Sequence, residues 1–405
     1  MNVTTTAPTR PAPAEAADLA LLTGPDADEL VAGALVGAAA APAGLHVEVA
    51  AIHHRPGSGV SVCYDVTYAG LAEPDHLVVS TAAASAREVA DRVAVIHDGP
   101  RRLRAWRRPD DPALPGLRSA LTPAVVAAWL GRDDRPELSV LAYRPTRRAV
   151  VAARCASTTA YVKIVRPHRG VHLLQRHLLL ADTAAPAPAV LGSPEPGVVL
   201  LAEAPGDSLA QVLANADLAR VPTPQAVIGA LDDLPDAVSD LDRRPSWADR
   251  LDFHAAAARA ALPDRADEVS DVVRRVGATL ASAPVAPVVP THGDLNVANL
   301  FVADRQPSAL IDVDSIGPGR RVDDLATLLA HLAVLPSLAP EQYGVVPAVL
   351  RSWTPVFADA VGARSLHART AAVLVSLIAG ATPAQAFVRL ELARDAVARA
   401  EGSPA

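Results

Sequence analysis

This chain of 405 residues has few aromatic side chains, one methionine and two cysteines. Aromatic residues make up 3% of the sequence while apolar residues make up 50%, so the core must be built from Ala, Val and Leu. Cys63 and Cys155 provide neither a disulfide framework nor the spacing of a metal site. We therefore expect a fold that is held together by aliphatic packing alone.

Blocks of basic residues and long apolar runs are also missing. The net charge is −7 and the two signs are interspersed, which argues against a nucleic-acid groove. The longest weakly apolar run, Leu30 to Leu45, is mostly Ala and Gly and contains Pro42, so it is a poor membrane span. Residues 1–17 lack the basic and apolar segments of a secretory signal. We expect a cytoplasmic protein without nucleic-acid or membrane partners.

The first half of the chain is typical of β-structure. Residues 1–17, rich in Thr, Pro and Ala, are predicted to be a disordered tail. Residues 18–110 are interpreted as an N-terminal β-rich module and residues 111–205 as a second one, with a short helix over 122–130. Strands are predicted over 46–52, 59–66, 76–80, 138–143, 149–153, 160–165 and 198–202. The first module is interpreted as a degenerate repeat of the second, although any two antiparallel meanders would look alike.

The second half, residues 206–405, shows helical periodicity. Apolar residues recur at spacings of three and four over 208–216, 223–240, 246–262, 266–283, 323–335, 344–360, 365–379 and 383–400. Thr382 is expected to cap the last helix, with Pro383 at its first position and Gly402 beyond its end. A β-rich half before a helical half predicts an α+β protein.

Within the helical half, the segment from His292 to Leu300 carries an unusual set of polar residues. Asp294 is followed five residues later by Asn299, and Asp312 ends an apolar run thirteen residues further on. Phosphoryl transfer needs a carboxylate to receive a hydroxyl proton, and an amide oxygen and a second carboxylate to hold Mg²⁺. The order and types of these residues therefore predict a phosphoryl-transfer site.

The local sequence explains how these residues would meet. Strands are predicted over 299–303 and 309–313, separated by a turn at 304–308. Such a hairpin would bring Asn299 close to Asp312 and Asp314. Asp314 would share a strand face with Asp312, where a second Mg²⁺ contact, a contact to a substrate amine or a solvated acid are alternatives.

The stretch resembles the aminoglycoside phosphotransferase and choline kinase-like family, which has a bilobal protein-kinase-like fold. The pattern of that family is matched by His292-Gly293-Asp294, Asn299, Ile311-Asp312 and Asp324-Leu325-Ala326. This chain has Asn296 where the family often has His. The resemblance implies that residues 111–205 are the N-lobe, that residues 206–405 are the C-lobe and that residues 18–110 are an additional module.

The resemblance also implies roles for single residues. Asp294 would be the catalytic aspartate that accepts the hydroxyl proton, while Asn299 and Asp312 would bind Mg²⁺. Lys163, centred in an apolar strand, would contact the ATP phosphates, and the backbone at Glu203 and Ala204 would pair with adenine. His292 and Asp324 would support the catalytic loop rather than react.

Two parts of the family pattern are missing. The helix after the lysine strand has no acid before Asp182, which leaves Gln175 as a polar partner for Lys163. The turn at 145–149 has no glycine, so its backbone amides with Arg147 or Arg148 would have to hold phosphate, unless these arginines are simply solvated.

We therefore expect an ATP- and Mg²⁺-dependent phosphotransferase that acts on a hydroxyl group of a small molecule. Aminoglycosides, other antibiotics, amino sugars and amino alcohols are the candidate acceptors. One alternative is a kinase of Ser or Thr in a peptide of a biosynthetic pathway. The other is a pseudokinase that binds a peptide or another partner without phosphoryl transfer.

Overall fold

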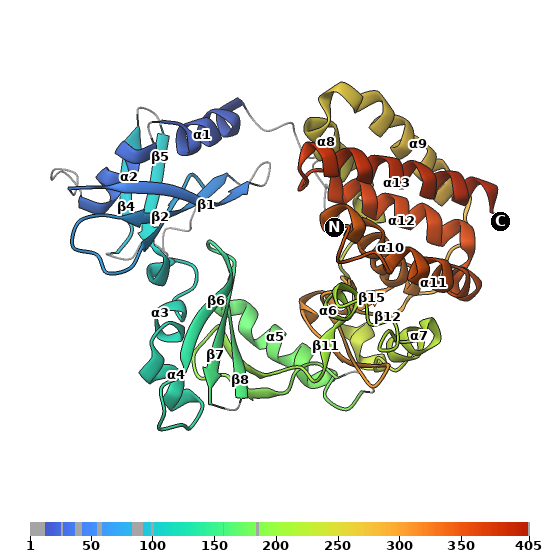
Figure 1. Cartoon of the computed structure of the whole chain (residues 1–405), viewed down its shortest axis with the longest axis horizontal. Coiled ribbons are helices and arrows are strands. Elements are labelled where there is room, and N and C mark those ends of the chain that lie inside the picture. The colour runs from blue at the N-terminus through green and yellow to red at the C-terminus, as the bar shows by residue number, and fades with distance from the viewer. Residues whose placement is uncertain are drawn as a thin grey trace. The chain divides into compact units, whose positions relative to one another are not determined.

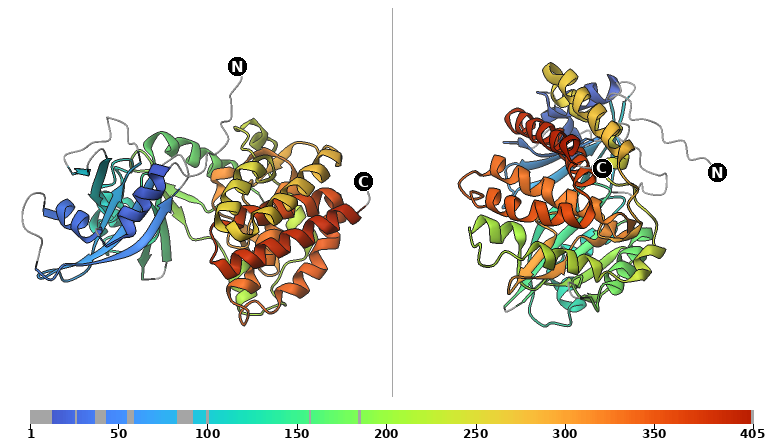
Figure 2. Two further views of the ribbon diagram at one scale, coloured as in Figure 1. Left: turned by 90° about the horizontal axis from the view of Figure 1, so that it is seen from above. Right: turned by 90° about the vertical axis from the view of Figure 1, so that its right-hand side faces the viewer.

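The chain divides into two compact units, which are described separately. The computed structural model describes residues 13–25, 27–36, 43–54, 59–82, 92–98, 101–156, 158–183 and 186–403. Of these, residues 13–174 and 190–203 form the β-rich unit, and residues 175–189 and 204–403 form the helical unit. Figures 1 and 2 show the elements of both units, coloured along the chain.

The β-rich unit begins with two helices and a five-stranded antiparallel sheet of order β1-β2-β3-β5-β4. Its elements are α1 (Pro13–Thr23), α2 (Ala27–Val36), β1 (His46–His54), β2 (Val60–Thr67), β3 (Asp75–Ser80), β4 (Ala94–Asp98) and β5 (Arg101–Arg107). Alternate residues of β2, including Val62 and Tyr64, face a core that Leu22 of α1 and Val31 of α2 complete. The helices therefore cover one face of this sheet (Figure 1).

A second five-stranded antiparallel sheet follows, with the order β6-β7-β8-β10-β9. Its elements are α3 (Leu117–Ala120), α4 (Pro123–Trp129), β6 (Glu137–Arg144), β7 (Arg148–Cys155), β8 (Thr158–Val165), α5 (Pro167–Leu179), β9 (Val190–Gly192) and β10 (Val198–Ala202). Leu117 and Val126 of the two short helices pack with Val162 and Ile164 in its separate core.

The two sheets have the same pattern of strand order. The first strand of each sheet also carries an irregularity, between Val49 and Ala51 in β1 and between Val140 and Ala142 in β6. A duplicated module would give this likeness, and so would two meanders of common type. The duplication and the proposed domain limits therefore stay predictions.

The helical unit combines eight longer helices with short strands in its described residues. These elements are β11 (Asp207–Ser208), α6 (Leu209–Ala214), α7 (Pro224–Asp232), α8 (Leu251–Ala261), α9 (Ala266–Ser282), β12 (Val289–Thr291), β13 (Leu300–Ala303), β14 (Gln306–Leu310), β15 (Gly317–Gly319), α10 (Arg321–Leu338), α11 (Val346–Val361), α12 (Ala363–Ile378) and α13 (Pro383–Gly402). Four short 3₁₀ helices lie between them in the described residues, at η3 (Asp236–Asp240), η4 (Ala248–Arg250), η5 (Pro263–Arg265) and η6 (Val313–Ser315).

Helix α12 is the centre of this unit and packs against α8, α9, α10, α11 and α13. Its consecutive residues from Ala371 to Val375 are all buried, as expected of a helix that is covered on every side. Thr382 caps α13 as predicted, since its side chain accepts the N–H of Gln385 in a capping box. Gly402 is the last residue of α13 rather than a residue beyond it.

The predicted α+β class, with β-structure first and helices after residue 205, is confirmed. One expectation about the N-terminal tail differs from the structure, and some elements were not predicted. Residues 13–17 belong to α1, although they were predicted as part of a disordered tail; residues 1–12 of that tail lie outside the described residues. Helix α2 and the strands β4 and β5 were not predicted. No helix among the described residues is long and apolar enough to span a membrane.

Candidate active site

The loop that carries Asp294 lies between β12 and β13, and the pairing of β12 with β15 holds its start. Thr291 pairs with Gly317 and donates its hydroxyl to the carbonyl oxygen of Gly317 over 2.8 Å. The next glycine, Gly293, has φ of +79°, and a Cβ atom there would lie 2.4 Å from the carbonyl oxygen of Ser315. Only glycine lets this loop approach the chain that follows Asp312 so closely.

Asp324, near the start of α10, binds the same loop. Its carboxylate accepts the backbone N–H of His292 at 2.9 Å and that of Gly293 at 2.8 Å. Burial raises the pKa of the Asp324 carboxyl, while Arg321 and the two N–H donors act in the opposite direction. With 1% of its surface exposed, Asp324 exchanges almost all of its hydration for these contacts.

His292 is fully buried and joins the loop to the segment before Asp312. Its Nε2 lies 3.0 Å from the carbonyl oxygen of Ile311, and its Nδ1 lies 3.4 Å from the backbone nitrogen of Asp294. A neutral ring with its proton on Nε2 satisfies both contacts, because Nδ1 then accepts the N–H of Asp294. These contacts fit a supporting residue rather than a base.

Asn299 links the two acidic residues of the predicted site. It is 7% exposed, and its Nδ2 donates to the carbonyl oxygen of Asp294 over 3.0 Å. Its own carbonyl oxygen accepts the N–H of Ile311, which precedes Asp312, at 2.9 Å. Because Nδ2 is engaged, the Oδ1 atom of Asn299 is available as an acceptor.

The donor types fit magnesium. An amide oxygen from Asn299 and a carboxylate from Asp312 are hard ligands, and Mg²⁺ usually takes only one or two carboxylates from a protein. Among the residues that the structure describes, no group of three His, Cys, Asp or Glu side chains gathers into a metal site.

The predicted hairpin exists, but its second strand was placed too late in the chain. β13 and β14 are joined by a two-residue turn at Asp304 and Arg305, whose φ angles are +47° and +64°. The return strand therefore ends at Leu310. Asp312 adopts the left-handed conformation with φ of +56°, and Asp314 lies in η6. The expectation that Asp312 and Asp314 share a strand face is wrong.

In the β-rich unit, Lys163 lies in the middle of β8, paired with Val150 of β7 and Val199 of β10. Val162 and Ile164 point into the core of this sheet, so Lys163 lies on the opposite face. It is 6% exposed and is the only lysine in the chain. Arg148 is the first residue of β7. Gln175 is an exposed residue of α5 within the helical unit, so its predicted pairing with Lys163 stays a prediction.

The predicted linker follows β10. Glu203 is an exposed residue and accepts a hydrogen bond from the Tyr161 hydroxyl, whose pKa is raised by burial and by this carboxylate. Ala204 is buried and begins the helical unit. At Gly206, φ is +84° and a Cβ atom would lie 2.3 Å from the carbonyl oxygen of Val302. The Pro-Gly sequence thus permits a close approach between the end of the linker and β13.

Asp111 supports the turn between β6 and β7 and was not foreseen. Its carboxylate accepts the N–H of Thr146 and the hydroxyl of Tyr143, both at 2.7 Å. Arg166 donates to the carbonyl oxygen of Thr146 over 2.7 Å, and Thr146 has φ of +60°. Burial raises the pKa of Asp111 despite these donors. The turn between β6 and β7 contains no glycine and is held by side chains, among them Asp111, which lies 35 positions before Thr146.

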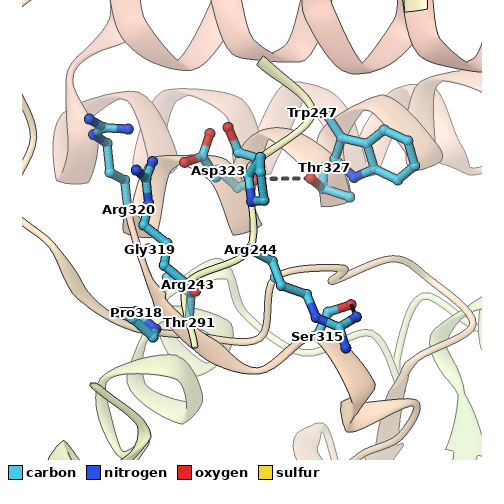
Figure 3. Close-up of a pocket in the computed structure, with 13 residues that line it drawn as sticks. Arg243, Arg244, Trp247, Thr291, Ser315, Pro318, Gly319, Arg320, Asp323 and Thr327 are labelled. Atoms are coloured by element: carbon cyan, nitrogen blue, oxygen red, sulfur yellow. Dashed lines mark hydrogen bonds between the residues drawn. The ribbon is translucent and has the colours of Figure 1, made fainter. Parts of the chain in front are cut away.

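An arginine-rich depression lies beside the catalytic loop and was not predicted from the sequence (Figure 3). Gly293 and Ser315 line it together with residues of the segment from Arg243 to Trp247. The consecutive pair Arg243-Arg244 was the available signal, but nothing local connects it with Asp294.

Comparison with known proteins identifies the family. The model of the phosphotransferase enzyme family (APH) matches residues 129–344, which is more than half of the chain. This match covers Lys163 and all residues of the catalytic loop. It confirms the family resemblance that the His292–Asp324 region indicated. A search among curated proteins gives no significant match.

Solved structures with similar folds are remote in sequence. A thermostable mutant of aminoglycoside phosphotransferase APH(4)-Ia, in a ternary complex with ADP and hygromycin B, is 15% identical with a TM-score of 0.47, covering 69% of this chain and 98% of its own. A glucosamine kinase in complex with glucosamine, ADP and inorganic phosphate is 16% identical with a TM-score of 0.43, covering 91% of this chain and 98% of its own. Neither identifies a substrate for this chain.

Proposed function

This chain belongs to the phosphotransferase enzyme family, and we propose that it is a small-molecule kinase, which transfers the γ-phosphoryl group of ATP to a hydroxyl group of its acceptor. The observation that carries this proposal is the position of Asn299. Its side chain binds the backbone of Asp294, and its backbone binds the residue before Asp312. The three polar groups that the reaction needs are thereby joined within one unit.

In this reaction the acceptor oxygen bonds to the γ-phosphorus, and the bond from that phosphorus to the bridging oxygen of ADP breaks. The acceptor proton passes to the carboxylate of Asp294. The carbonyl oxygen of Asp294 accepts a hydrogen bond from Nδ2 of Asn299 at 3.0 Å and another from Nδ2 of Asn296 at 3.4 Å. These bonds hold the backbone of the proton acceptor in place, and catalysis by positioning depends on such support.

Asn299 Oδ1 and the Asp312 carboxylate would hold Mg²⁺, which neutralises charge on the phosphates when bound. Lys163 would contact the α- and β-phosphates, and the backbone at Glu203 and Ala204 would pair with adenine. Lysine binds phosphate as a point charge, and Lys163 is the only lysine of the sequence.

A panel of hydroxylated acceptors, screened by ATP consumption with Mg²⁺, tests this function. The panel contains aminoglycosides, other hydroxylated antibiotics, amino sugars, amino alcohols and hydroxylated acids. We expect ATP consumption above the acceptor-free rate with at least one class, together with a phosphorylated product in the mass spectrum. ATP consumption that no acceptor increases would contradict the proposal.

A further inference from the structure

The depression of Figure 3 lies directly beside the catalytic loop. Gly293, which precedes Asp294, lines it, and so does Ser315, which follows Asp314. Trp247 also contributes to its lining, with a partly buried ring that packs on the helical core. A small molecule bound here would therefore contact the loop that carries the proposed proton acceptor.

Most of the charged groups of the depression are already paired with each other or with neighbours. Asp323 forms an ion pair with Arg369 of α12. Asp249 lies at 2.8 Å from Arg243 and at 3.8 Å from Arg320, so one carboxylate compensates two guanidinium groups. The lining thus keeps an excess of positive charge.

Arg244 differs from these arginines. Its Nη1 donates to the hydroxyl of Ser315 over 3.1 Å, and its side chain is exposed. Within the described ranges, Arg244 forms no ion pair. A guanidinium group has five N–H donors, so this single bond to a hydroxyl leaves most of its donors for a ligand.

The backbone around Arg244 is held in position. A Cβ atom on Gly317 would lie 3.0 Å from the carbonyl oxygen of Asp242, which shows how closely the segment packs on β15. Ser246 and Asp249 exchange hydrogen bonds between side chain and backbone, at 3.1 Å and 3.2 Å, and close the segment on its other side. Arg244 is therefore presented from an anchored loop.

We propose that this depression binds the acceptor and that Arg244 binds a carboxylate or phosphate group that the acceptor carries besides its hydroxyl group. The inference rests on the proposed phosphotransferase function. Guanidinium groups bind both kinds of oxyanion through two parallel N–H···O bonds. The ring of Trp247 provides an apolar surface for the carbon skeleton. Polycationic acceptors are disfavoured, because they would place like charges beside Arg243, Arg244 and Arg320.

Matched acceptors test the proposal with the full-length protein. Gluconate and glycerate represent the carboxylates, glycerol phosphate represents the phosphates, glucose and glycerol are the neutral counterparts, and hygromycin B is the polycation. We expect kcat/KM for an anionic acceptor to exceed that of its neutral counterpart by about 10- to 100-fold, the range of a charge-assisted hydrogen-bond pair. The carboxylate and phosphate arms show which group Arg244 prefers.

Variants connect this preference with the residue. Arg244→Gln should raise KM for the anionic acceptor by about 10- to 100-fold and leave KM for ATP unchanged, while Arg244→Lys should keep part of the affinity. Arg351→Gln removes an exposed charge outside the depression and should change neither constant.

The outcomes of these experiments distinguish an anionic acceptor subsite from a nucleotide contact and from failure of the proposed function. Anionic acceptors that are turned over no better than their neutral counterparts, with KM unchanged in Arg244→Gln, would overturn the anionic subsite and leave the phosphotransferase function intact. An increase of KM for ATP in Arg244→Gln, with KM for the acceptor unchanged, would assign Arg244 to the nucleotide instead. Absence of turnover with every acceptor would contradict the proposed function itself.

Discussion

Replacing Asp324 tests whether a buried carboxylate behind the catalytic loop controls both stability and rate. In the native protein it accepts two backbone N–H groups, from His292 at 2.9 Å and Gly293 at 2.8 Å. Asp324→Ala would leave both donors buried without an acceptor, at about 1–3 kcal/mol each. Arg321, 3.6 Å away, would also lose one of its two carboxylate partners and keep Asp232. We expect the free energy of unfolding to fall by about 3–5 kcal/mol.

The rate should fall as well, because the two N–H donors belong to the two residues that precede Asp294. A displacement of about 1 Å in a catalytic group costs about 100-fold in rate. Asp324→Asn keeps one acceptor oxygen but turns an amide donor toward the other N–H, so both effects should be present and smaller. Leu390→Ala is the matched control: this residue is fully buried in the helical core, and its truncation should cost about 2–5 kcal/mol.

The assay combines urea unfolding with turnover at a temperature where every variant is folded. Asp324→Ala should lose stability and rate, whereas Leu390→Ala should lose stability alone. If Asp324→Ala loses as much stability as Leu390→Ala but keeps normal turnover, the role of this carboxylate in holding the loop is refuted.

Three further predictions follow from other residues. Asp312→Ala should abolish the Mg²⁺ dependence of ATP affinity, while Asp304→Asn, in the exposed hairpin turn, should retain it. Titration calorimetry of ATP binding with and without Mg²⁺ measures this dependence. A Mg²⁺ dependence that persists in Asp312→Ala would contradict the metal site. An acyl-phosphate analogue of ATP should acylate Lys163, the only lysine, and excess ATP should protect it; a peptide map with Lys163 unmodified would argue against its phosphate contact. Burial and Arg389 lower the pKa of His331 from 6.5 to about 4. Between these two pH values the imidazole is therefore protonated in the unfolded chain and neutral in the native state. The free energy of unfolding should therefore decrease by about 2–3 kcal/mol as pH falls from about 6.5 to 4, and His331→Leu should remove this decrease; an identical pH profile for both proteins would contradict it.

The residues that the sequence alone could identify are those whose relation is local. Asp294 and Asn299 are five residues apart on one loop, and the hairpin that follows brings Asp312 back to them. The helices of the second half were also predictable, since their apolar periodicity reflects the face that each buries. The capping box of α13 was predictable for the same reason, because its two residues, Thr382 and Gln385, are only three positions apart.

Contacts between distant segments could not be predicted. Asp111 binds Thr146 across 35 positions, and Arg244 binds Ser315 across 71. No periodicity or spacing relates such pairs, because packing of separate elements brings them together. The conformation of Asp312 was not predicted for a different reason. The apolar run before it favoured a continued strand, but the chain turns there into the left-handed region, which Asp tolerates better than most residues.

The central claim, that Asp294 receives the acceptor proton during transfer from ATP, is tested most directly by label transfer from γ-labelled ATP to the acceptor. Asp294→Asn keeps the shape of the side chain and the backbone contacts of the loop but removes the base. We predict that transfer falls by about two to four orders of magnitude, while nucleotide affinity is preserved. Transfer at a rate near that of the unmodified protein would contradict the account.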